Sequence, residues 1–105
     1  MRTIEEWYNI LVELTENTDF EVLMKTQISS PVVAIVPRGY YTPQRIAIYP
    51  KKTQNAGLVF DRDVFEIPHI NALMGEPHRD KGNRPHYNNI PDETIIEVCE
   101  TFLHT

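Results

Sequence analysis

The chain has 105 residues, of which 41% are apolar and 24% charged, the length and composition of one globular domain spanning residues 1–105. Its single cysteine, Cys99, excludes an intramolecular disulfide, and no apolar run approaches the roughly 18 residues that a transmembrane helix needs. The N-terminal residues lack the apolar core of a signal peptide, so we expect a cytoplasmic protein without membrane contact.

The formal net charge is −5, but the charges are segregated along the chain. Residues 1–36 carry six acids and two bases, and residues 91–105 carry four acids and no base. Residues 37–60 hold four bases and no acid, and residues 61–90 come close to neutrality. The net charge argues against non-specific coating of nucleic acid, although it does not exclude a local basic site.

The first predicted element is a helix that follows Thr3 and ends near Asn17. Thr3 and Glu6 have the spacing of a capping box, and apolar residues then recur at helical spacing. From residue 20 to residue 28 the apolar period is two, which predicts a half-buried strand. Ser29-Ser30-Pro31 interrupts that strand.

The middle of the chain predicts a hairpin. The unbroken apolar run at residues 32–36 is typical of a central strand that is covered on both faces. Residues 37–43 read as a turn, and the alternating residues 45–49 predict a strand that pairs beside the first and is stopped by Pro50. A polar loop follows from residue 51 to residue 57.

The last third predicts short strands and two helices. Residues 58–60 and 64–67 are strand-like, with residues 61–63 as a turn or bulge. Pro68 and Gly75 bound a short helix, residues 76–90 read as loop, and Pro91-Asp92-Glu93 opens the last helix. The order α-β-β-β-(β)-α-α with short connections predicts an α+β fold, in which N-terminal and C-terminal helices pack on an antiparallel sheet of three to four strands.

The sequence predicts no catalytic residue and no cofactor, so we do not expect an enzyme. Its four glycines form no phosphate-cradling pattern, and no nucleophile elbow is present. Cys99 lies on the apolar stripe of the last helix, which indicates a core residue. Between His78 and His86 lie one carboxylate and several cations, but their spacing matches no metal signature, and we expect no metal.

Acidic helix faces indicate a protein-binding surface. Three glutamates of the last helix fall at i, i+4 and i+7, and three of the first helix share a face in the same way. If both helices cover one side of the sheet, they present a broad negative surface to a basic partner such as a nuclease. The expected partner-binding residues are Glu5, Glu13, Glu16, Glu93, Glu97 and Glu100.

The alternative is a site for a phosphorylated small molecule, a nucleotide or a nucleic acid. Cations and tyrosines interleave between residues 38 and 52, a combination that suits phosphate pairing and base stacking. The expected ligand-binding residues are Arg38, Tyr40, Arg45, Lys51, His78, Arg79, Arg84 and His86. A concave pocket formed jointly by residues 38–52 and 78–86 would favour this alternative over the inhibitor.

In size, acidity and layout the chain is similar to small phage-encoded inhibitors of host defence and to toxin-immunity proteins. This similarity lies in general character across the chain and in no motif, so it assigns no residue a role. It adds to the acidic helix faces in favouring a non-enzymatic inhibitor as the leading hypothesis.

Overall fold

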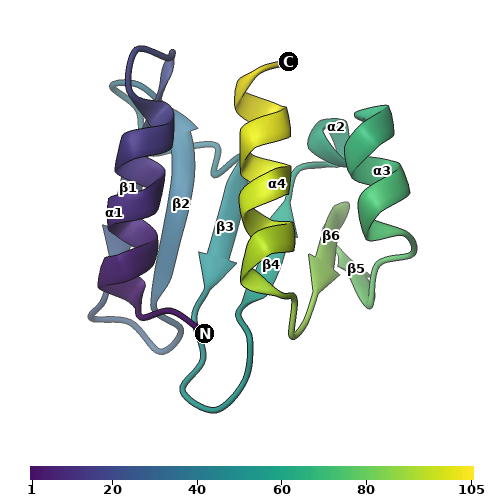
Figure 1. Cartoon of the computed structure of the whole chain (residues 1–105), viewed down its shortest axis with the longest axis horizontal. Coiled ribbons are helices and arrows are strands. Elements are labelled where there is room, and N and C mark those ends of the chain that lie inside the picture. Colours follow the sequence, from purple (N-terminus) through teal and green to yellow (C-terminus); the bar gives the residue numbers. More distant parts are fainter.

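The computed structural model describes all 105 residues and shows four helices in front of a six-stranded antiparallel sheet (Figure 1). In chain order the elements are α1 (Ile4–Thr15), β1 (Phe20–Lys25), β2 (Val32–Pro37), β3 (Ile46–Tyr49), β4 (Gly57–Phe60), α2 (Arg62–Phe65), α3 (Pro68–Met74), β5 (Arg79–Lys81), β6 (Arg84–Tyr87) and α4 (Asp92–Leu103). The strands lie in the order β1-β2-β3-β4-β6-β5. The α+β class is confirmed, but the sheet has six strands instead of three to four.

The first helix begins as the sequence predicts. The Thr3 hydroxyl accepts from the Glu6 N–H at 3.1 Å, and the Glu6 carboxylate accepts from the Thr3 N–H at 2.8 Å. The helix ends at Thr15, slightly before its predicted end, and Asn17 takes the left-handed conformation with a φ of 60°. The following strand, β1, stops at Lys25 rather than continuing to residue 28.

The predicted hairpin of β2 and β3 is confirmed. Val33 pairs with Ile48 and Ile35 pairs with Ile46 in antiparallel register. Residues 32–36 are all buried, because β2 is an interior strand that pairs with β1 on its other side. Here an apolar run without alternation correctly predicted a strand buried on both faces.

All four helices pack on the same face of the sheet. One cluster of 17 buried residues joins helix residues such as Trp7, Val64, Ile70 and Val98 to strand residues such as Ile48. Cys99 belongs to this cluster and is fully buried, and burial raises the pKa of its thiol to about 12. The thiol is therefore a core group, as the helical spacing predicts.

The predicted strand at residues 64–67 is wrong. Residues 62–65 form the short helix α2, which starts when the Asp61 carbonyl accepts from the N–H groups of Val64 and Phe65. Apolar side chains at positions 64, 65 and 67 fit one turn of helix as well as they fit a strand, and so short a segment has too few repeats to separate the two.

The predicted loop at residues 76–90 is also wrong, because it contains the β5–β6 hairpin. Gly82 and Asn83 form its two-residue turn, both with positive φ, 62° and 61°. A Gly-Asn pair between two strands is a recognised hairpin signal. The flanking residues are mostly charged, so they lack the apolar alternation that marks a strand.

Candidate functional site

No helix packs on the second face of the sheet, which we call the helix-free face. Antiparallel partners point to the same side, so one row across this face takes a side chain from each strand: Leu23, Ala34, Ala47, Val59, His86 and Arg79. Its centre is a small cluster of buried strand residues, against which Tyr49 packs. By alternation Lys25, Lys81 and Arg84 also lie on this face, and Glu21 is the only carboxylate at its strand positions.

A hollow of about 310 Å³, the sheet pocket, lies on this face. Segments far apart in the sequence meet around it, since residues 49–51, 57–59 and 86–88 lie on neighbouring strands and their connections. Its lining includes Tyr49, Lys51, Gly57, Val59, Arg79 and His86. The basic 38–52 segment and the 78–86 segment therefore converge on a concave site.

The sheet pocket is electropositive. No carboxylate lines it, and neither Lys51 nor Arg79 has an ion-pair partner. Burial lowers the pKa of His86, and the positive charges of neighbouring Arg79 and Arg84 lower it further. The contribution of these two guanidiniums to the lowered pKa indicates a positive local potential, which attracts anions.

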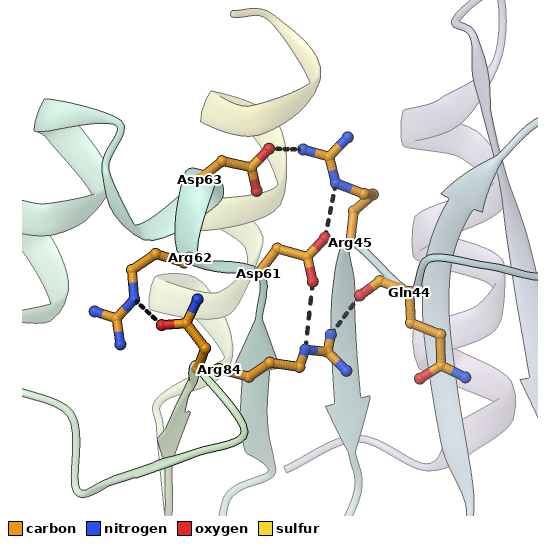
Figure 2. Close-up of polar contacts among 7 residues, drawn as sticks. Gln44, Arg45, Asp61, Arg62, Asp63 and Arg84 are labelled. Atoms are coloured by element: carbon orange, nitrogen blue, oxygen red, sulfur yellow. Dashed lines mark hydrogen bonds and ion pairs between the residues drawn. The ribbon is translucent and has the colours of Figure 1, made fainter.

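Two of the predicted ligand-binding arginines are instead held by a carboxylate. Asp61 follows β4 and lies between Arg45 and Arg84, as Figure 2 shows. The Arg45 Nε lies 3.0 Å from one carboxylate oxygen and the Arg84 Nε 3.3 Å from the other. Arg45 also pairs with Asp63, and its guanidinium lies over the Phe102 ring. Both guanidiniums are therefore already engaged by carboxylates of the chain, and the ligand contacts expected of them stay a prediction.

Three other predicted residues lie outside the sheet pocket. The Arg38 side chain donates to main-chain carbonyls, including that of Phe20 at 2.6 Å. His78 Nδ1 accepts from the Asn88 N–H at 2.8 Å. Tyr40 is 67% exposed and lines a separate shallow hollow on the same face. Of the eight predicted residues, only Lys51, Arg79 and His86 come together, and the sequence missed the pocket floor at Gly57 and Val59.

The predicted acidic surface lies on the helix layer. Helices α1 and α4 contact each other, and neither contains a basic residue (Figure 1). Of the six predicted glutamates, Glu97 alone has an ion pair, with His69 at 2.6 Å. The largest hollow, about 650 Å³, lies at the C-terminal ends of both helices, where Glu16, Asp19 and Asp63 line it.

Comparisons with protein-family models, curated proteins and solved structures found no match for the chain. No three His, Cys, Asp or Glu side chains group closely enough to hold a metal ion. None of the helices is long and apolar enough to cross a membrane.

Proposed function

We propose that this chain is a non-enzymatic binding protein whose sheet pocket takes a phosphate-bearing ligand of about nucleotide size. The observation that supports the proposal is the convergence of Lys51, Arg79 and His86 from two distant segments on one hollow without carboxylates. Two cations without ion-pair partners on one hollow give it a positive potential, which attracts an anion. The geometry therefore supports a phosphate-binding protein better than it supports an acidic inhibitor.

The size and lining of the sheet pocket fit such a ligand. Its volume of about 310 Å³ lies at the lower end of the range for small-molecule sites. Lys51 and Arg79 can pair with a phosphate, and the half-buried ring of Tyr49 offers an apolar surface for a base. No nucleophile or general base is assigned, so the proposed activity is binding alone.

An NMR titration with adenosine 5′-monophosphate tests this proposal. We expect the amide signals of Gly57, Val59, Arg79 and His86 to shift together as the nucleotide is added. The double variant Lys51→Glu with Arg79→Glu should weaken binding at least about 100-fold, since it removes two charge-assisted contacts of about 1.5 kcal/mol or more each.

The matched control carries Lys25→Glu with Lys81→Glu. These two residues are exposed, lie on the same face and change the net charge equally, but they do not line the sheet pocket. The control should retain most of the affinity. Equal losses in both double variants would show non-specific attraction and would contradict the assignment of the pocket, as would an absence of shifts in the wild-type protein.

His86 is expected to give binding a pH dependence. Burial is the largest cause of its lowered pKa, and the positive charges of Arg79, Arg84 and Lys81 add to it, while Asp80 opposes them. A bound anion favours the protonated imidazole, so the complex takes up a proton and affinity rises as the pH falls from about 7.5 to about 5.5. A dinucleotide probe suits the measurement because its phosphodiester keeps its charge. His86→Gln should flatten the profile, and a flat wild-type profile would contradict the prediction.

The acidic helix layer supports a second candidate function, an inhibitor that occludes a basic protein such as a nuclease. The observation that favours it is the large hollow at the C-terminal ends of α1 and α4, where the helix dipoles add to the carboxylates of Glu16 and Asp19. Asp63 and Arg45 also line this hollow and form an ion pair with each other. Such a hollow suits a lysine or arginine side chain of a partner. The proposed contact residues are those of the acidic faces, Glu5, Glu13, Glu16, Glu93, Glu97 and Glu100.

An octalysine peptide is a suitable probe for this second candidate. Changing Glu93, Glu97 and Glu100 together to lysine should slow association of the peptide, with an effect that shrinks as salt rises. The same variant should bind adenosine 5′-monophosphate normally, because α4 lies on the opposite face of the sheet from the sheet pocket. An unchanged association rate would exclude the helix layer as the contact surface.

A further inference from the structure

A second hollow adjoins the sheet pocket beyond the strand ends, where β2 begins, β3 ends and the chain leads into α1. This edge pocket has a volume of about 450 Å³, and its lining includes Arg2, Ile4, Pro31, Pro50, Lys51 and Lys52. Lys51 lines both hollows. Ser30 and Tyr49 line the sheet pocket, and the residues that follow them, Pro31 and Pro50, line the edge pocket. The two hollows therefore adjoin at Lys51 and along these residue pairs.

Lysine and arginine side chains line both hollows, and Glu5 is the one carboxylate in the lining of the edge pocket. Arg79 and Lys51 line the first hollow, and Lys51 and Lys52 line the second. The amino terminus and Arg2 also lie in the edge pocket, but both pair with Asp92, at 3.4 and 3.7 Å. The three cations without ion-pair partners, Arg79, Lys51 and Lys52, therefore carry most of the attraction for an anion.

We propose that the ligand is single-stranded nucleic acid, which runs from the sheet pocket over Lys51 into the edge pocket. The inference rests on the proposed phosphate site and extends it from one phosphate to a chain of phosphates. A mononucleotide fills only the sheet pocket and leaves Lys52 without an anion. The edge pocket joins this cation to the apolar surfaces of Ile4, Pro31 and Pro50, which suit the face of an unpaired base.

Fluorescence anisotropy with labelled tetranucleotides of DNA and RNA tests the inference against adenosine 5′-monophosphate. At least one tetranucleotide should bind about tenfold or more tightly than the mononucleotide, because one additional stacked base contributes about 1–3 kcal/mol. Lys52→Glu should remove most of this gain and leave mononucleotide binding unchanged. The salt dependence of tetranucleotide binding should also become shallower, by about 0.7 in log–log slope for each phosphate that the protein no longer neutralises.

The matched control is Lys25→Glu, which has the same charge change on an exposed strand residue outside both hollows. It should leave the preference for the tetranucleotide intact. If the mononucleotide binds and neither tetranucleotide binds more tightly, the proposal that the ligand is single-stranded nucleic acid is wrong. The proposed phosphate site is then still supported. If neither kind of probe binds, both proposals fail.

Two further results would overturn the inference alone. Inorganic polyphosphate of equal charge should bind more weakly than the tetranucleotide, and equal affinity would show that bases make no contact. A tetranucleotide that binds tightly but is indifferent to Lys52→Glu would show that the chain does not enter the edge pocket.

Discussion

Replacing Arg45 with glutamate is expected to lower the free energy of unfolding by about 2 kcal/mol, because it breaks a half-buried, charge-assisted contact with Asp61. The guanidinium of Arg45 pairs with Asp61 and Asp63 and lies over the Phe102 ring. Burial already raises the pKa of Asp61 above its usual value, despite two neighbouring guanidiniums. A glutamate at position 45 would place a third carboxylate where positive charge is needed.

Urea denaturation measures this change, and Lys51→Glu is the matched control. Lys51 is exposed and has no ion-pair partner, so its substitution should shift stability by less than about 0.5 kcal/mol. An Arg45→Glu variant as stable as the control would show that the ion pairs with Asp61 and Asp63 contribute little. The result also bears on function, because an unfolded Arg45 variant that fails to bind says nothing about a direct interaction with the ligand.

Replacing Trp7 with alanine is expected to cost about 3–5 kcal/mol, the range for removing a large aromatic side chain from a core. Trp7 is fully buried in the cluster that joins α1 and α4 to the sheet. Its indole N–H is buried without a hydrogen-bond partner. The side chain therefore stabilises the fold through packing, which outweighs the desolvation cost of its unpaired N–H.

Trp7→Phe separates the two effects. It keeps most of the ring and removes an unpartnered donor, so it should cost much less than the alanine variant. The stability of both variants is measured by chemical denaturation monitored by circular dichroism. Tryptophan fluorescence is unsuitable, because both variants remove the only tryptophan of the chain. A phenylalanine variant as unstable as the alanine variant would contradict the conclusion that packing of the ring supplies most of the stabilisation.

The sequence predicted well those elements that bury a continuous apolar surface. Thr3 and Glu6 located the start of α1, and the apolar run at residues 32–36 located β2, because capping and burial are local and strong signals. It failed for the β5–β6 hairpin. That hairpin is fixed by the Gly82–Asn83 turn and by pairing with β4, and its charged side chains carry no apolar period.

The same missed hairpin explains why the candidate site was predicted only in part. The sequence identified the right residue types. Strand register decides which of these residues share a face of the sheet, and the register around β6 could not be predicted because β6 itself was missed. Pairing of His86 with Val59 brings Arg79 and His86 to the side of Tyr49 and Lys51. Arg45 and Arg84 could not be separated from this set by sequence, because their partner Asp61 is made available only by the fold.

Acidic residues gather on α1 and α4, and Lys25, Arg79 and Lys81 lie on the helix-free face, so the charge of the molecule is polarised across the sheet. A protein with a net charge of −5 is repelled by a distant polyanion as a whole, but its dipole turns the basic side forward as the two approach. The protein therefore meets the polyanion with its helix-free face already turned toward it. When the protein binds a polyanion as proposed, its acidic helix layer faces the solvent and repels the next copy, so we expect bound copies to be widely spaced.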